Sequence, residues 1–208
     1  MHVQSSQRSL IYVLLIGAVI GYLALVLPTI SIHGISYDEH VDLTVAASYG
    51  SQPLGWLRGS DVDSANVRLP MYLSGIAFEA LGSFSITWSR LLSCVLGVLT
   101  LIAVFLYCIR YLDQTKAVIA CIILATSPYF LAFSKVAMTE GDIFITCLTA
   151  WLLLCVASLQ RESNIRWITA TGLVLGLAMS SKASAAALVP ATILLLFLPG
   201  KHLPTAED

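Results

Sequence analysis

The sequence has few charged residues. Of its 208 residues, 11% are charged and 58% are hydrophobic, whereas a soluble globular domain carries about 25% charged residues. A water-soluble fold of this size could not bury so much apolar surface. The few charges are also balanced, with 11 Lys and Arg against 12 Asp and Glu, so the chain lacks the basic surface of a nucleic-acid-binding protein. The composition therefore indicates an integral membrane protein with no nucleic-acid partner.

The sequence also lacks a cysteine pattern typical of metal sites or of small disulfide-rich domains. Its five cysteines all lie within apolar runs, and no two of them form a CxxC pair. They are Cys94, Cys108, Cys121, Cys147 and Cys155. We expect all five to be free thiols buried in the membrane domain. We expect no metal ion and no other cofactor.

Long uncharged runs are what the sequence does contain. Residues 10–30 carry no charge, and at ~1.5 Å per residue they would reach roughly 31 Å, enough to cross the hydrocarbon core. A cleaved signal peptide has a shorter apolar region and an A-x-A site, which is absent here, so we expect a retained anchor. Further apolar runs, predicting five more spans, cover residues 91–109, 117–133, 143–159, 167–180 and 183–198.

These runs predict an all-α, polytopic transmembrane helical bundle of about six spans. We expect one membrane domain over residues 1–208, with a long first loop at 31–88 and a polar tail at 199–208. Positive charges gather in the short turns on one side, at Arg8, Arg110, Lys116, Arg161, Arg166 and Lys201. By the positive-inside rule that side is the cytoplasm, so the long loop should be extracytoplasmic.

Two parts of the long loop have helical patterns. Ser36 and Glu39 fit an S-x-x-E capping box, which predicts a helix that continues until Gly50. Residues 70–81 repeat apolar side chains at helical spacing and end at Gly82. Both helices should lie along the membrane surface.

An acidic pair begins the first of these surface helices. The helix dipole stabilises a carboxylate in the first turn, so Asp38 should be ionised and able to accept a proton, with Glu39 beside it. Acidic residues also favour helix starts for structural reasons alone. Asp42 lies one turn after Asp38, and with His33 or His40 it would permit a metal site, although the spacing is not diagnostic.

Other charged residues adjoin the predicted spans on the same side. Glu140 and Asp142 precede the fourth span, and Lys182 lies between the fifth and sixth. Ionisable groups at such depths mark functional sites or serve as interfacial anchors. Three guanidinium groups suited to phosphate are Arg58, Arg68 and Arg90.

Five features occur in a fixed order along the chain. They are Asp38–Glu39 after the first span, R-L-P-M-Y at 68–72, W-S-R at 88–90 before an apolar run, S-P-Y-F-L-A-F-S-K-V-A-M-T-E at 127–140 and G-L-A-M-S-S-K at 176–182. In order and spacing they resemble the N-terminal part of the protein O-mannosyltransferase and aminoarabinose transferase family, membrane glycosyltransferases of the GT-C fold. The chain departs from the family pattern where Leu69 replaces the first proline of K-P-P-L-Y and where Asp142 adds an acid.

The resemblance implies transfer of a sugar from a polyprenyl phosphate in the membrane to a protein or lipid acceptor outside the cytoplasm. Asp38 would be the general base and Glu39 would orient a substrate, while Glu140 would support the same cavity. The residues that would bind the phosphate are Arg68, Arg90 and Lys182. The membrane would be the plasma or inner membrane of a bacterium or the endoplasmic reticulum of a eukaryote.

Family members are usually longer, so we expect the front half of a larger enzyme. Two other readings stay open at this point. A truncated or diverged relative could bind a lipid-linked sugar or scaffold a complex without catalysis. A small transporter would need polar residues near the middle of the bilayer, which the spans almost lack.

Overall fold

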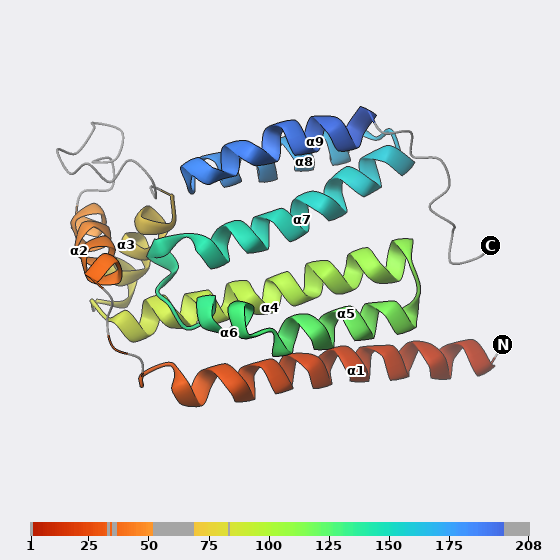
Figure 1. Cartoon of the computed structure of the whole chain (residues 1–208), viewed down its shortest axis with the longest axis horizontal. Helices are drawn as coiled ribbons and strands as arrows, with labels where there is room; N and C mark the ends of the chain where they lie inside the picture. Colours follow the sequence, from red (N-terminus) through yellow and green to blue (C-terminus); the bar gives the residue numbers. More distant parts are fainter. Residues whose placement is uncertain (1, 33, 35–36, 52–68, 83, 198–208) are drawn as a thin grey trace.

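The computed structural model describes residues 2–32, 34, 37–51, 69–82 and 84–197. Within these ranges the protein is helical and contains no β-strand, which confirms the all-α prediction. The longer helices lie side by side in one bundle (Figure 1). They are α1 (His2–Val26), α4 (Ile86–Tyr111), α5 (Gln114–Thr126), α7 (Asp142–Arg161), α8 (Ile165–Met179) and α9 (Leu188–Phe197). Shorter elements are η1 (Leu27–Thr29), α6 (Pro128–Phe133), η3 (Met138–Glu140) and η4 (Ala183–Ala187).

Three helical segments are long and apolar enough to cross a membrane. They are Tyr12–Thr29, Ile86–Tyr111 and Asp142–Arg161. The shorter apolar helices are Leu69–Leu81, Gln114–Thr126, Ile165–Met179 and Ala183–Phe197. The protein is therefore an integral membrane protein, and the count of six spans stays a prediction.

The helices α2 (Tyr37–Ser51) and α3 (Leu69–Leu81) cover one end of the bundle (Figure 1). Both occur where the loop pattern predicts them, although the capping residue Ser36 lies outside the described residues. Leu43 and Ala46 of α2 pack against Met71 and Phe78 of α3. Gly82, with φ 62°, ends α3 in the left-handed conformation that glycine adopts most readily. We call this the α2–α3 end.

Two predicted spans are interrupted. The apolar run 117–133 forms α5 and α6, separated by Ser127, which is extended with ψ 123°. Pro128 explains the break, because proline lacks an N–H and disfavours helical backbone in the residue before it. The run 183–198 begins as the 3₁₀ helix η4, and the α-helix starts only at Leu188.

The bundle core lies where α1, α4, α6 and α7 meet. Tyr22, Leu101, Phe130 and Ile143 are buried there, and the rings of Tyr22 and Phe130 are 5.5 Å apart between centroids. Gly97 lets α1 approach α4 closely, since a Cβ at this position would stand 1.9 Å from Oη of Tyr22. All five cysteines are buried and free, as predicted.

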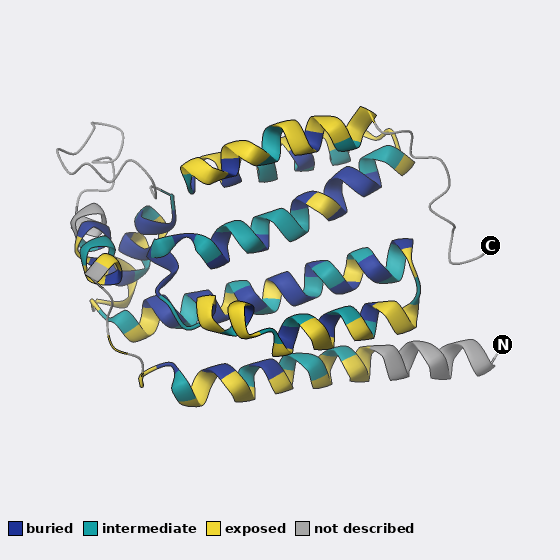
Figure 2. Ribbon diagram, viewed as in Figure 1, coloured by how far each residue is buried: buried dark blue, intermediate teal, exposed yellow. Residues whose placement is uncertain are grey.

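The G-x-x-x-G spacing of Gly172 and Gly176 predicts a close helix pair, and this prediction is wrong. Both glycines are exposed on α8, and a Cβ at either position would meet no atom within 4 Å. The outward surfaces of α8 and α9 carry many exposed apolar side chains (Figure 2). Such surfaces are expected where lipid hydrocarbon covers the protein.

Charges separate between the two ends of the bundle. Arg90 and Lys182 lie at the α2–α3 end, whereas Arg110 and Arg161 lie together at the opposite end, where the Arg161 guanidinium donates to the Arg110 carbonyl at 3.4 Å. We call the latter the Arg110 end. The predicted topology requires this separation, and it also predicts that the Arg110 end faces the cytoplasm. Arg58 lies outside the described residues.

Candidate functional site

A buried ion pair fixes the α2–α3 end. Arg90 of α4 donates from Nε and Nη2 to the two carboxylate oxygens of Glu39 at 2.9 and 2.8 Å. The side chains are only 3% and 2% exposed. Two parallel bonds between a guanidinium and a carboxylate are the strongest form of such a pair. Glu39 is thus held rigidly at the start of α2.

The same pair binds three backbone groups from two further segments. Arg90 donates from Nη1 to the carbonyl of Ile30 at 2.7 Å and from Nη2 to that of Gly34 at 3.2 Å. Glu39 accepts from the N–H of Ala137 at 2.8 Å. The chain after α1, the start of α2, the outer part of α4 and the segment before η3 are therefore joined at one point.

Two serines of α4 hold the segment that leads to α7. Ser93 Oγ donates to the carbonyl of Val136 at 2.6 Å, and Ser89 Oγ accepts from the N–H of Met138 at 3.1 Å. Gly141, with φ 78°, then turns the chain from η3 into α7. These contacts hold Glu140 at the end of η3, immediately before Gly141.

Carboxylates from two elements, α2 and η3, lie near one another at the α2–α3 end. Asp38 is exposed on α2, and Asp42 lies half-buried one turn later on the same face. The pKa of Asp42 is raised to about 7, chiefly by burial and also by the nearby charges of Glu140 and Asp38, while Lys182 opposes them. A carboxyl group with a pKa near neutrality can hold or release a proton under physiological conditions.

Lys182 supplies the cation of this site. Its ammonium lies 2.6 Å from Oδ1 of Asp142, and the two side chains are 29% and 34% exposed, so a ligand could reach the pair. The N–H of Leu69 donates to the carbonyl of Ser180 at 3.1 Å, which holds the start of α3 beside the end of α8. The site is thus built from α2, η3, the start of α7 and the junction after α8.

The structure places the predicted residues in two groups. Asp38, Glu140 and Lys182 lie close enough to Asp42 to act on its pKa, whereas Glu39 and Arg90 form a separate buried pair. Arg68 lies outside the described residues. Among the residues that the structure describes, no group of three His, Cys, Asp or Glu side chains is placed to hold a metal ion.

Two members of the site were not assigned a catalytic or substrate-binding role from the sequence. Asp42 was considered only for a metal site, although its i+4 spacing puts it on the face of Asp38. Asp142 was a general functional-site candidate and an additional acid next to Glu140. Its contact with Lys182, 40 residues away, has no signal in the sequence.

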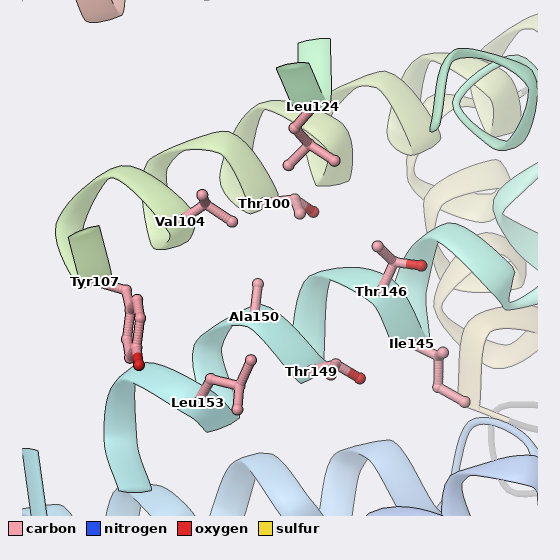
Figure 3. Close-up of a pocket in the computed structure, with 9 residues that line it drawn as sticks. All are labelled: Thr100, Val104, Tyr107, Leu124, Ile145, Thr146, Thr149, Ala150 and Leu153. Carbon is pink, nitrogen blue, oxygen red and sulfur yellow. The ribbon is translucent and has the colours of Figure 1, made fainter. Parts of the chain in front are cut away.

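An apolar groove lies between α4 and α7, with one residue of α5 at its edge (Figure 3). Its volume is about 340 Å³. The lining residues are Thr100, Val104 and Tyr107 of α4, Leu124 of α5, and Ile145, Thr146, Thr149, Ala150 and Leu153 of α7.

Comparison with known proteins gives one match. The family model described as dolichyl-phosphate-mannose-protein mannosyltransferase matches residues 69–205. The matched range contains Arg90, Glu140 and Lys182 and begins after Asp38 and Glu39. No curated protein and no solved structure matches the chain. Because the match covers more than half of the sequence and agrees with the helical membrane fold, the chain belongs to the dolichyl-phosphate-mannose-protein mannosyltransferase family.

Proposed function

We propose that the chain carries the extracytoplasmic reaction site of a glycosyltransferase that moves a sugar from a polyprenyl phosphate to an acceptor hydroxyl. The observation that supports this proposal is the group formed by Asp38, Asp42, Glu140 and Lys182 at one end of a membrane bundle. Such a transfer needs a proton acceptor for the hydroxyl and a cation for the departing phosphate. Both kinds of group stand here within electrostatic reach of each other.

Asp38 is the proposed general base. It is exposed in the first turn of α2, where an acceptor can reach its carboxylate. Its carboxylate accepts the proton of the acceptor O–H as that oxygen bonds to the anomeric carbon of the sugar. The bond between this carbon and the phosphate oxygen breaks, and its electron pair leaves with the polyprenyl phosphate.

Lys182 is the proposed ligand of the leaving phosphate. A lysine ammonium carries three N–H donors, and Asp142 orients it through a 2.6 Å contact. Arg68, three residues before Met71 of α3, stays a proposed second phosphate ligand. Glu140 is proposed to set the net charge of the site together with Lys182. The negative charge of Glu140 raises the pKa of Asp42, whereas the positive charge of Lys182 lowers it.

Glu39 and Arg90 receive a different role from the one that the sequence implied. Their described hydrogen bonds go to each other and to three backbone groups of two segments. We therefore assign them as positioning residues that hold α2 and η3 in place. In this role Glu39 fixes its neighbour Asp38 rather than contacting a substrate.

Replacing the base tests the proposal. Asp38→Asn keeps the size of the side chain but removes the charge that accepts the proton, so turnover should fall roughly 10²-fold or more while donor binding changes little. The measurement is transfer of labelled mannose from a polyprenyl phosphate by the purified protein in liposomes. Glu79→Gln is the matched control, because this acid is exposed on α3 at the same end and should leave turnover unchanged.

Normal turnover in a folded Asp38→Asn protein would remove Asp38 as the base. A wild-type protein that binds the donor without transferring the sugar would instead favour a binding or scaffolding protein.

A further inference from the structure

Arg161 is a cation held in place at the Arg110 end. It is the last residue of α7. Its guanidinium lies 5.5 Å from the centroid of the Tyr111 ring, and Nη1 donates to the carbonyl of Arg110 at 3.4 Å. Tyr111 is itself 0% exposed, and its hydroxyl lies 2.7 Å from Oγ of Ser158, one turn before Arg161. The ring that contacts Arg161 is therefore fixed between α4 and α7.

Positive charge exceeds negative charge around this ring. Arg110 also lies near it, 5.7 Å from the Tyr111 centroid, and pairs with Glu162. In the part of the chain that the structure describes, no carboxylate pairs with Arg161 or with the exposed Arg166. Of the five N–H groups of the Arg161 guanidinium, one makes a described hydrogen bond. Arg161 therefore has N–H donors available for an anion.

These cations lie where two membrane spans end. Both α4 and α7 are long and apolar enough to cross a membrane, and Arg110 and Arg161 belong to their last turns. The turn from α4 to α5 and the turn from α7 to α8 lie at the same end of the bundle (Figure 1). Basic side chains at the end of a span reach the headgroup region of the bilayer. The predicted topology turns this end to the cytoplasm, where anionic lipids give the membrane a negative surface. The position thus favours a phospholipid phosphate as the anion.

Exposed apolar side chains adjoin the cation. Ile165 is the first residue of α8 and is 71% exposed, and Ile168, one turn later on the same helix face, is 52% exposed. Leu112, directly after α4, is 38% exposed. A free phosphate ion would gain nothing from these side chains. The acyl chains of a lipid bound through its phosphate would cover them and remove apolar surface from water.

We propose that Arg161 binds the phosphate of an anionic phospholipid at the Arg110 end, and that the acyl chains of this lipid lie against Ile165 and Ile168. A guanidinium offers two parallel N–H groups to phosphate oxygens, which an ammonium cannot do. Arg110 adds positive charge to the site, while Glu162 pairs with Arg110 rather than with Arg161. The lipid contacts α7 and α8 together, so its binding should stabilise the folded protein. This site is separate from the proposed reaction site at the α2–α3 end.

Removing one cation at a time tests the inference. The probes are phosphatidylglycerol and phosphatidylcholine with the same acyl chains, added to the delipidated protein in detergent. The rise in unfolding temperature with lipid concentration gives the apparent affinity. We expect phosphatidylglycerol to bind the wild type more tightly than phosphatidylcholine. Arg161→Met should weaken binding of phosphatidylglycerol about 5-fold or more, which is the effect of one cation at an anionic lipid surface.

A matched lysine controls for the loss of charge. Lys116 is exposed at the same end and lies 2.7 Å from Asp113. Lys116→Met removes the same charge as Arg161→Met, but the proposed lipid does not contact this residue, so the affinity should change less than about 2-fold. Equal losses for the two variants would overturn the site, because general attraction between charges would then explain both.

Two further comparisons identify the ligand and its place. Lys182→Met, at the α2–α3 end, should leave the affinity for phosphatidylglycerol unchanged. If Lys182→Met abolishes the stabilisation and Arg161→Met does not, the lipid binds at the proposed reaction site and the inference is wrong. Glycerol 1-phosphate, the probe without acyl chains, should not raise the unfolding temperature. Equal stabilisation by glycerol 1-phosphate or by phosphatidylcholine overturns an anionic lipid as the ligand.

A last measurement requires no substitution. Wild-type protein is reconstituted in nanodiscs with phosphatidylglycerol that carries a diazirine on an acyl chain near the glycerol, and the irradiated protein is digested and analysed by mass spectrometry. We expect label within 161–168, and an excess of phosphatidylglycerol, but not of phosphatidylcholine, should suppress it. Label spread evenly over all helix ends contradicts a defined site. Equal suppression by the two lipids does so too, because it indicates general contact with the bilayer.

Discussion

Arg90 and Arg110 stand near opposite ends of the same helix, α4, and each pairs with a glutamate, 51 and 52 residues away in the sequence. The Arg90–Glu39 pair is 3% and 2% exposed, whereas the Arg110–Glu162 pair is 35% and 51% exposed. Arg90 also binds two backbone carbonyls. Arg110 instead lies over the rings of Trp167 and Tyr111, at 5.4 and 5.7 Å from their centroids.

The two pairs differ in how much they contribute to the stability of the fold. A buried charge that loses its partner stays uncompensated, which costs about 3–5 kcal/mol, whereas an exposed pair contributes about 0–1 kcal/mol. The α2–α3 end is therefore the part of the bundle whose geometry depends on one polar contact. It is also the end that carries the proposed reaction site.

The largest effect should come from breaking the buried pair. Arg90→Met leaves Glu39 buried without its guanidinium, so the free energy of unfolding should fall by about 3–5 kcal/mol. Arg110→Met at the other end of α4 should lower it by no more than about 1 kcal/mol. Denaturant or thermal unfolding followed by circular dichroism in detergent measures both.

A double variant sharpens this comparison. In Arg90→Met/Glu39→Leu neither charge is left buried, so stability should recover part of the loss even though α2 is no longer clamped. Equal losses for Arg90→Met and Arg110→Met would contradict the distinction between the two ends.

The next largest effect on stability should come from the close contact between α1 and α4 at Gly97. Gly97 lies two turns along α4 from Arg90, where a Cβ would stand 1.9 Å from Oη and 2.6 Å from Cζ of Tyr22. Gly97→Ala should therefore displace α1 and cost about 1–3 kcal/mol, as overpacked cores do. Gly172→Ala is the control, because it meets no atom within 4 Å and should be neutral or stabilising by up to about 1 kcal/mol. If Gly97→Ala and Gly172→Ala unfold at the same temperature, the predicted overpacking between α1 and α4 at Gly97 is contradicted.

Sequence patterns located the helices better than they located the contacts between them. The helical spacing of residues 70–81 predicted α3, and the start of α2 was predicted from the capping-box spacing of Ser36 and Glu39. Pro128 indicates the break after α5. The apolar run continues across this residue, so residues 117–133 were predicted as one span. Helix existence depends on local periodicity, so it can be read from neighbouring residues.

The candidate site was predicted in composition but not in arrangement. Asp38, Glu140 and Lys182 were selected individually, and the structure gathers them around Asp42. The partner of Glu39 could not be predicted, because the carboxylate was explained equally well by a local capping box. Its 51-residue separation from Arg90 becomes a contact only when α2 folds over the end of α4.

A smaller effect should be the pH dependence of stability, whose sign can be predicted and which should arise at the α2–α3 end. Burial, Glu140 and Asp38 raise the pKa of Asp42 from 3.8 to about 7, so between these values the folded protein binds more protons than the unfolded chain. Stability should therefore be highest below this window and fall as the pH rises through it. Between pH 5 and 8 the linkage would reach about 2.6 kcal/mol, and solvent screening of this half-buried carboxyl should reduce the loss to about 1–2 kcal/mol. Asp42→Asn should abolish it. Unfolding temperatures at the two pH values measure this difference.

Asp113, the N-cap of α5 near the Arg110 end, supplies the opposite case. Hydrogen bonds from Lys116 lower its pKa, so its contribution is lost only as the pH falls below the ordinary range of an aspartate. Asp113→Asn should therefore leave the stability difference between pH 5 and 8 as it is in the wild type. A wild-type slope that persists in Asp42→Asn would show that another group causes it.

The smallest effect should be the ionic part of the exposed pair at the Arg110 end. Glu162 accepts hydrogen bonds from Arg110 on one carboxylate oxygen and from Nε1 of Trp167 on the other, the latter at 3.1 Å, and Glu162→Gln keeps one oxygen that can still accept one of them. It should cost less than about 0.5 kcal/mol, whereas Arg110→Met also removes the contacts with two aromatic rings and should cost up to about 1 kcal/mol. A double-mutant cycle on these two substitutions isolates the coupling energy, which should shrink further in high salt because both charges are screened. A coupling above about 2 kcal/mol that persists in salt would mean that the pair is desolvated, for example by the lipid headgroups at this end. The contrast between the two ends of α4 would then lie in backbone anchoring alone, since only Arg90 binds carbonyls of distant segments.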